Sequence, residues 1–459
     1  MDFNEIKLIK NDHPLYIQLA KHIKNQIINN KILHGEKLPT IRAAANILNV
    51  NTSTVINCYK ILENEGFVTT IKGSGSYVTK NIKKRDKLYM DFTGKDSQIE
   101  SFPIDEITSS INYILKHSGV DIFKYEDSRG NYELKESLVD YFKYFSIKTT
   151  IDLLQIISGG QQALDIISKS LLNFGDTVFT ESPTYRGALE SFKNREARII
   201  EVQLDEDGLN ILDLESKIVT RRPTILYLMT FNQKPTGYNY SLEKKHKILE
   251  LSQKYNFYII EDDQGSEISL KETKTLKSMD TYDRVIYIKS FSPLFMPGLR
   301  LGCLIPPKSL YNRILKTKLS TDISTPGLLQ KSFAHYLAKN NWIDYFENIK
   351  TVKKEKIELT NLLLNTYLGN KIECNMNSDS GSYWLKLNRI DVDLLSKECF
   401  QKGVEFLSGT IMGSEYKEFI RLNIASIPKT NIEDGLKIIQ QEIIKQESTN
   451  RRVSLNPGF

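Results

Sequence analysis

The first eighty residues change from a helical to a strand-like spacing of apolar side chains. In the first predicted helix an apolar side chain recurs every four residues: Leu15, Leu19, Ile23 and Ile27. A second, short helix is expected after Thr40 and a third after Asn51, because both residue types cap helix N-termini well. Residues 67–71 and 76–79 then resemble two strands, joined by a turn at 72–75 whose glycines permit positive φ. The pattern predicts three helices followed by a two-stranded wing.

This order of elements is the winged helix-turn-helix arrangement, in which the third helix can enter the major groove of DNA. Small polar side chains at the start of that helix fit phosphates or base edges, although Thr52 also suits a plain helix start. Arg42 is the best candidate for a charged DNA contact, the alternative being a structural ion pair, and Lys72 is a candidate phosphate contact. The predicted DNA-binding residues are Thr40, Arg42, Asn51, Thr52, Ser53, Thr54, Lys72, Gly73 and Ser74.

The positive charge of the chain is concentrated in the same region. Residues 1–88 contain 14 Lys and Arg against 7 Asp and Glu, a net charge of +7, so that the remainder carries −1 of the total of +6. This asymmetry indicates a polyanion-binding module attached to a neutral body, the alternative being a solvated basic surface. Residues 80–87 lack apolar periodicity and are predicted to be a basic linker, which either touches DNA phosphates or is a solvated spacer.

From residue 88 onward, predicted strands and helices alternate, as in an α/β domain. Four apolar runs are expected to be buried strands: 177–180, 224–229, 257–260 and 285–288. Gly159 and Gly160 lead into a helix whose free N–H groups and dipole suit a phosphate, although two glycines often form only a tight turn. The run at 257–260 leads into Glu261-Asp262-Asp263, which places a carboxylate at the end of a predicted strand. Residues 446–459 lack periodicity and are predicted to be a mobile tail.

Several classes of protein are disfavoured by the composition. The chain has no run of 18 or more apolar residues and no signal-peptide pattern, which argues against a membrane partner. Its four cysteines are far apart, with no Cys-x-x-Cys spacing. We therefore expect a cytoplasmic protein with free thiols and without a metal site.

Two stretches of the chain resemble known families. Leu38-Pro39-Thr40-Ile41-Arg42, with residues 55–66 and the Gly-Ser-Gly wing, resembles the DNA-binding domain of GntR-family bacterial regulators. The order of motifs in the large domain is similar to that of fold-type I aminotransferases, which depend on pyridoxal phosphate. Together the two resemble the MocR (GabR-like) subgroup of GntR regulators over residues 12–445. The resemblance implies a winged helix-turn-helix at 1–79, the linker at 80–87, and at 88–445 an α/β domain with a small C-terminal α+β subdomain.

The resemblance also implies site residues, a cofactor and a homodimer. Tyr185 would stack on the pyridine ring of pyridoxal phosphate, and Asp262 would pair with the ring nitrogen. Arg421 matches the arginine that binds the carboxylate of an amino-acid ligand, a task suited to a planar guanidinium. The residues implied to surround the cofactor phosphate are Gly159, Gly160, Gln161, Ser290, Ser292 and Arg300.

Three positions depart from the family pattern. Pro293 stands where the family has the lysine that forms the Schiff base, and proline has no amine for an imine or a proton transfer. Gln264 replaces a tyrosine, and Lys234 replaces an aromatic residue or asparagine. Pyridoxal phosphate is therefore expected to bind non-covalently if it binds at all. Lys234 or Lys289 is an alternative source of an imine, and a repurposed pocket for another anion, or a vestigial pocket, is a further possibility.

The leading hypothesis is a transcriptional regulator that binds double-stranded operator DNA and senses a small effector through a dimeric aminotransferase-like domain. The absence of a lysine at 293 predicts that it is not a transaminase. One alternative is an active pyridoxal phosphate-dependent transaminase with an accessory DNA-binding domain. The other is a regulator whose large domain only dimerises.

Overall fold

The chain folds into two compact units, residues 1–89 and 90–459, each described by itself. The structure is a computed structural model and describes residues 14–28, 32, 35–64, 67–71, 74–78, 89–95, 102–271, 273–369, 371–373 and 379–455. The predicted linker, residues 80–87, lies outside the described residues.

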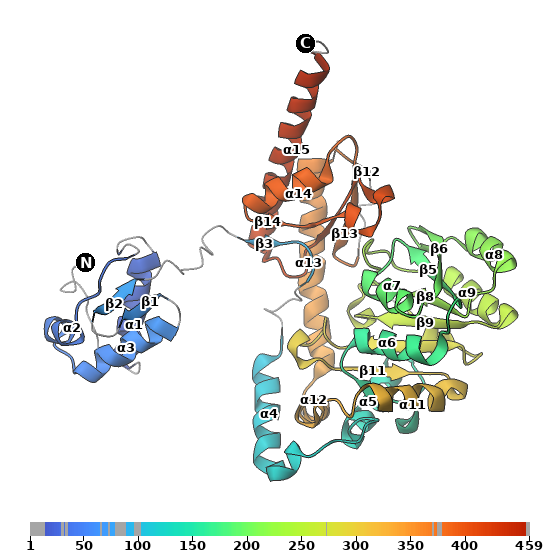
Figure 1. The fold of residues 1–459 in the computed structure, drawn as a ribbon, viewed down its shortest axis with the longest axis horizontal. Helices are drawn as coiled ribbons and strands as arrows, with labels where there is room; N and C mark the ends of the chain where they lie inside the picture. Colours follow the sequence, from blue (N-terminus) through green and yellow to red (C-terminus); the bar gives the residue numbers. More distant parts are fainter. Residues whose placement is uncertain are drawn as a thin grey trace. The chain divides into compact units, whose positions relative to one another are not determined.

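In its described residues, the N-terminal unit has three helices and a hairpin (Figure 1). These are α1 (Leu15–Ile28), α2 (Ile41–Leu48), α3 (Thr52–Asn64), β1 (Val68–Ile71) and β2 (Gly75–Val78), the two strands being antiparallel. The predicted inner face of α1 is buried at Leu19, Ile23 and Ile27. Thr40 caps α2 by accepting a 3.2 Å hydrogen bond from the Ala43 N–H. The winged helix-turn-helix predicted from the spacing is confirmed.

The large unit is built on an eight-stranded sheet in the order β4-β11-β10-β9-β8-β5-β6-β7. The strands are β4 (Gln155–Ile157), β5 (Thr177–Ser182), β6 (Arg198–Asp205), β7 (Gly208–Leu209), β8 (Ile225–Leu228), β9 (Tyr258–Asp263), β10 (Val285–Ser290) and β11 (Gly302–Ile305). The central strands run parallel, from β6 to β10, and their continuous apolar burial explains the four runs seen in the sequence.

Helices cover both faces of this sheet (Figure 1). One face packs against α6 (Gly160–Leu171), α7 (Arg186–Lys193) and α11 (Tyr311–Thr321). The other face packs against two groups: α8 (Ile211–Thr220), α9 (Leu242–Tyr255) and α10 (Leu276–Met279) on one half, and α4 (Ile104–Ser118), α5 (Tyr132–Tyr144) and α12 (Gly327–Lys339) on the other. Successive side chains of a strand point to opposite faces of the sheet. Two adjacent residues of β9, or of β10, therefore pack into different hydrophobic cores.

The predicted C-terminal α+β subdomain is also present. A four-stranded antiparallel sheet, β12 (Ile372–Glu373), β13 (Ser382–Leu387), β16 (Phe419–Asn423) and β15 (Leu407–Ser408), packs with α13 (Trp342–Leu368), α14 (Val392–Gln401) and α15 (Ile432–Leu455). A short parallel pair joins β3 (Met90–Asp91) to β14 (Val404–Glu405). Within the described residues, no helix is long and apolar enough to cross a membrane.

The expectation of an unstructured tail from residue 446 is wrong for 446–455, because α15 continues to Leu455. Ile439 and Ile443 anchor this helix in the subdomain core, and adding further residues to an existing helix costs little. Glu447 also accepts 2.6 and 2.7 Å hydrogen bonds from the Lys371 ammonium. The apolar periodicity stops before residue 446 because the buried face of α15 ends there, while the helix itself continues.

Candidate ligand-binding cavity and DNA-binding surface

A cavity of about 370 Å³ lies in the large unit, between the carboxyl ends of β9 and β10 and the α+β subdomain. Nearly all of the predicted cofactor and effector residues line it: Gly160, Gln161, Tyr185, Asp262, Ser290, Ser292, Arg300 and Arg421. Gly159 lies behind this wall, against Arg300. The fold therefore brings together residues that are up to 262 positions apart in the sequence.

One end of the cavity has the geometry of an anion site. Helix α6 begins at Gly160, and Gly159 before it has φ 89° and ψ 169°, a conformation restricted to glycine. A Cβ on Gly159 would come within 2.6 Å of the Arg300 guanidinium. That guanidinium donates a 2.9 Å hydrogen bond to the Ser158 carbonyl. The free N–H groups of the helix start and this guanidinium form a cradle for a phosphate.

Gln161 and Tyr185 are coupled beside this cradle. The Tyr185 hydroxyl donates a 3.2 Å hydrogen bond to the Gln161 side-chain oxygen. The amide nitrogen of Gln161 donates to the Gly187 carbonyl at 3.0 Å and to the Ser191 hydroxyl at 2.9 Å. The Gln161 side chain thus positions the aromatic ring, and its backbone N–H remains the group suited to the phosphate.

Asp262 is the single acidic side chain among the described residues that line the cavity. It is buried and accepts a 2.9 Å hydrogen bond from the Tyr227 hydroxyl and weaker ones of 3.4 Å from Gln264. Burial raises the pKa of the Asp262 carboxyl, although the Tyr227 hydrogen bond opposes this shift. A cationic group at this carboxylate, such as a protonated pyridine nitrogen, would favour its charged form.

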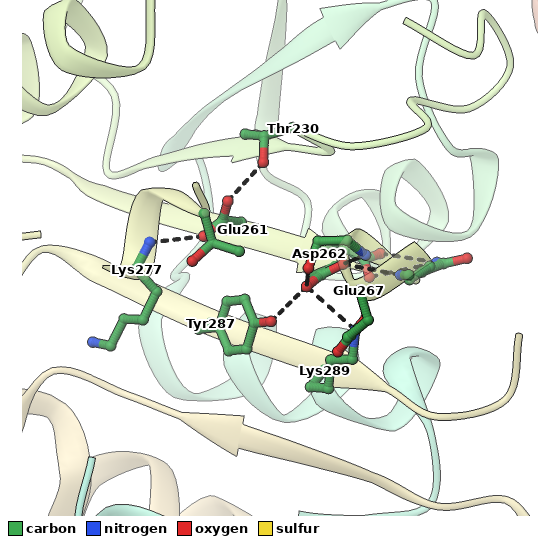
Figure 2. A network of polar contacts seen from close by, with 12 residues as sticks. Thr230, Glu261, Asp262, Glu267, Lys277, Tyr287 and Lys289 are labelled. Atoms are coloured by element: carbon green, nitrogen blue, oxygen red, sulfur yellow. Dashed lines mark hydrogen bonds and ion pairs between the residues drawn. The ribbon is translucent and has the colours of Figure 1, made fainter. Parts of the chain in front are cut away.

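Lys289 does not reach the cavity. In the sheet Ile288 pairs with Asp262 and Lys289 with Asp263, so Lys289 and Asp263 share the face opposite to the cavity. The Lys289 ammonium donates a 2.5 Å hydrogen bond to Glu267 and lies 3.3 Å from Asp263 (Figure 2). Burial lowers the pKa of Lys289, but the two carboxylates outweigh it and the net shift is upward. Of the two alternative amines, Lys289 is excluded by this placement.

Two tyrosines complete this buried network. Tyr287 donates a 2.5 Å hydrogen bond to Asp263, and Tyr141 of α5 donates one of 2.6 Å to Glu267. Figure 2 shows Tyr287 and Lys289 side by side on the same strand, both directed at the carboxylates. The network is structural, since none of its members lines the cavity.

The three residues that depart from the family pattern, Pro293, Gln264 and Lys234, all line the cavity. The Lys234 ammonium donates a 2.5 Å hydrogen bond to the Gln264 side-chain oxygen and lies 5.8 Å from the centre of the Tyr185 ring. Burial, together with the positive charge of Arg421, lowers the pKa of Lys234 to about 8. Pro293 contributes only an apolar ring to the wall.

Arg421 occupies the subdomain side of the cavity and is 5% exposed. It donates a 2.7 Å hydrogen bond to the Thr93 carbonyl and a long one of 3.5 Å to the Ser382 hydroxyl. Its Nε–H has no hydrogen-bond partner among the described residues. Burial lowers the pKa of this guanidinium to about 10. A buried, partly unsatisfied guanidinium fits the predicted carboxylate ligand.

The sequence did not point to Lys353 and Lys356, which also line the cavity from α13. They are 4% and 6% exposed. In the sequence they belong to the run Lys353-Lys354-Glu355-Lys356, which is typical of a solvated helix face. They are buried where α13 packs against other segments: Lys353 donates a hydrogen bond to the Ile268 carbonyl and Lys356 to the Ala425 carbonyl.

On the N-terminal unit, the predicted DNA-contacting side chains lie around the start of α3. Asn51, Thr52 and Ser53 are exposed, whereas Thr54 is half-buried. Arg42 is exposed and forms no ion pair with any residue that the structure describes, which disfavours the structural alternative. The Ser74 hydroxyl is 2.8 Å from that of Tyr77. Lys72 and Gly73 lie outside the described residues.

The sequence predicted free thiols, and three of the four cysteines lie among the described residues. Cys58, Cys303 and Cys399 are free and buried, whereas Cys374 is not among the described residues. Within the described ranges, no group of three or more His, Cys, Asp and Glu side chains is arranged to hold a metal ion.

Comparison with known proteins agrees with the two units. Residues 94–439 match the family of class I and II aminotransferases, and residues 15–78 match the bacterial regulatory proteins of the gntR family. The uncharacterized HTH-type transcriptional regulator YdfD of Bacillus subtilis is 27% identical to this chain, covering 95% of it and 97% of the relative. The probable rhizopine catabolism regulatory protein MocR of Rhizobium meliloti is 22% identical and covers 95% of each chain.

A kynurenine aminotransferase of Pyrococcus horikoshii, solved in complex with PMP, superposes on this chain with a TM-score of 0.73 at 25% identity. The match covers 80% of this chain and 95% of that chain. Fold, cavity and matches define a protein in which a gntR-type helix-turn-helix unit is joined to an aminotransferase-like unit. The chain belongs to the class I and II aminotransferase family, and its domain combination is that of the MocR-type regulators predicted from the sequence.

Proposed function

We propose that this protein is a cytoplasmic transcriptional regulator whose N-terminal unit binds operator DNA and whose large unit senses a small anionic ligand. The proposal rests chiefly on one observation. Pro293 lies in the cavity wall, while the residues suited to a phosphate, a pyridine nitrogen and a carboxylate line the same cavity. Such a cavity retains the means to bind ligands but lacks the amine expected at this position for transamination.

Pyridoxal phosphate fits this cavity as a non-covalent ligand. Its phosphate would bind at the start of α6 with Arg300, Ser290 and Ser292, its ring would lie on Tyr185, and Asp262 would face its nitrogen. When bound, the cofactor supplies an aldehyde that condenses with amines. We expect no transaminase activity, because Pro293 can neither anchor that aldehyde nor carry a proton.

We also propose that the protein is a homodimer formed through the large unit. Val120, Phe123 and Tyr125, which follow α4, are 80%, 76% and 83% exposed. Large apolar side chains gathered on one short segment are typical of a protein interface. A dimer carries two DNA-binding units and therefore favours two half-sites separated by whole helical turns.

The experiment that tests this proposal is a selection of binding sites from a pool of random duplex DNA with the full chain. We expect enrichment of a paired site, with affinity that falls by about 0.9 log unit per tenfold increase in salt for each neutralised phosphate. Failure to enrich any sequence would overturn the regulator. Turnover of an amino donor and a 2-oxo acid by the protein with pyridoxal phosphate would instead support the rival transaminase.

A further inference from the structure

A segment before α2 lies along the wing, the hairpin formed by β1 and β2 in the N-terminal unit. The Leu38 N–H donates a 2.8 Å hydrogen bond to the Ser76 carbonyl of β2. Beside this bond, an isolated antiparallel bridge pairs Lys37 with Tyr77. The segment thus adds a third stretch of chain to the two-stranded hairpin, and backbone pairing fixes Lys37 on the wing.

The Lys37 side chain runs from this pairing toward the tip of the wing. Gly75 and Tyr77 lie on either side of the buried Ser76, so both face away from the core of the unit. A Cβ added to Gly75 would lie 2.7 Å from the Cε and 3.5 Å from the Nζ of Lys37. The lysine therefore crosses β2 at a position where the absence of a side chain leaves room for it.

Two hydroxyl groups lie on the same part of the wing as this ammonium. The Ser74 hydroxyl is 2.8 Å from the Tyr77 hydroxyl, and the Lys37 ammonium is 5.6 Å from the centre of the Tyr77 ring. The Ser74 hydrogen bond lowers the pKa of the Tyr77 hydroxyl, and the positive charge of Lys37 contributes to the same shift. Lysine, serine and tyrosine side chains all contact phosphates in protein–DNA complexes.

No carboxylate in the described part of the unit pairs with Lys37. The residue is exposed, and it forms no ion pair with any residue that the structure describes. Holding a long side chain in one path across a strand costs conformational entropy. An anion at the tip of the wing offsets this cost through charge-assisted hydrogen bonds. The net charge of +7 over residues 1–88 attracts a polyanion to the same unit.

We propose that Lys37, Ser74 and Tyr77 form a phosphate-binding site on the wing, which contacts the sugar–phosphate backbone of DNA. This inference rests on the proposed function, in which the N-terminal unit binds operator DNA. It adds Lys37 and Tyr77 to the DNA-binding residues predicted from the sequence, and it gives Gly75 the role of leaving space for the lysine. A backbone contact carries no sequence information, so the site contributes to affinity for every duplex.

Salt titrations of DNA binding test the charge at this site. The natural full chain and each variant are titrated with the duplex enriched in the selection and with a duplex of unrelated sequence. Lys37→Gln is expected to reduce the slope of log affinity against log salt by about 0.9 for each wing that contacts DNA. At about 0.1 M salt this corresponds to a loss of about eightfold per wing, on both duplexes. Lys37→Arg keeps the charge and is expected to keep the slope.

Two further measurements separate the groups involved. Tyr77→Phe removes only a neutral hydroxyl, so it is expected to weaken binding without changing the salt slope. Acetylation of lysines in the natural chain needs no variant: the duplex is expected to slow the modification of Lys37 and to leave Lys21 at its rate in free protein. Lys21→Gln, which changes an exposed lysine of α1, is also the matched control for the salt titrations.

The wing site is overturned if Lys37→Gln has the affinity and slope of Lys21→Gln, or if the duplex leaves the acetylation of Lys37 unchanged. Weakening on the enriched duplex alone would also contradict a backbone contact. A natural chain that binds no duplex ends the regulator proposal together with this one. Normal binding by the natural chain with an unaffected Lys37→Gln variant removes the wing site and leaves the regulator proposal in place.

Discussion

Lys234 and Gln264, two residues that depart from the family pattern, are hydrogen-bonded to each other at 2.5 Å within the cavity. Gln264 also approaches both carboxylate oxygens of Asp262 at 3.4 Å. Burial and the positive charge of Arg421 lower the pKa of Lys234 to about 8, which makes this amine more reactive toward an aldehyde than an ordinary lysine. Lys234 therefore remains the alternative source of an imine in the cavity, since Pro293 has no amine.

Replacement of Pro293 by lysine is expected to restore covalent attachment of pyridoxal phosphate. The phosphate cradle, Asp262 and Tyr185 already line the cavity, and an amine at 293 supplies the group that forms the covalent bond. Incubation with pyridoxal phosphate and borohydride, followed by peptide mass mapping, is expected to locate the adduct at residue 293. The natural chain is the control and is expected to give no adduct; an adduct on Lys234 would contradict non-covalent binding.

Binding of a small anionic ligand in the cavity, such as pyridoxal phosphate, is expected to weaken above about pH 8. Lys234 and Lys353 both have pKa values lowered to about 8, and only their protonated forms attract an anion. Calorimetric titrations at a series of pH values spanning the two pKa values check this. An affinity that stays constant across pH 8 would show that neither lysine contacts the ligand.

Without ligand, raising the pH above about 8 should instead increase the free energy of unfolding. The two lysines have an ordinary pKa of 10.5 when unfolded and about 8 when folded, so between these values the unfolded chain binds more protons. The contribution of these groups to the free energy of unfolding therefore rises with pH over that window. Denaturant melts of the natural chain and of Lys353→Met across the window measure the contribution, which the variant should reduce.

Lys289→Met is expected to destabilise the large unit by about 3–5 kcal/mol, because it leaves the buried carboxylates of Asp263 and Glu267 without their cation. Denaturant unfolding measures this loss. Lys354→Met, which changes an exposed lysine, should remain within about 0.5 kcal/mol of the natural chain. A Lys289→Met variant as stable as this control would show that the network does not depend on its ammonium.

Arg42→Ala is expected to weaken DNA binding and to reduce the slope of log affinity against log salt by about 0.9, the value for one lost phosphate contact. If Arg42 contacts a base edge instead, preference at one position of the site relaxes. Lys21→Ala, which removes an exposed lysine of α1, is the matched control. Equal binding by Arg42→Ala and the natural chain would remove Arg42 from the DNA surface.

A site residue could be predicted from the sequence where residues adjacent in the chain specify its position. The start of α6 was predictable from Gly159-Gly160, because a helix N-terminus is specified by residues adjacent in the chain. Asp262 was predictable from its place at the end of an apolar run. Lys353 was not, because its charge run is typical of an exposed helix face and only the packing of α13 buries it.

By itself the sequence determined the winged helix-turn-helix, the alternating α/β unit and the absence of an amine at Pro293. These features depend on local spacing and residue chemistry, which act over a few positions of the chain. Tertiary structure alone decided that Lys289 faces the buried carboxylates while Lys234 and Lys353 face the cavity. The physical reason is that strand pleating and helix packing assign each side chain to one face, and the cost of burial then sets which charges need a partner.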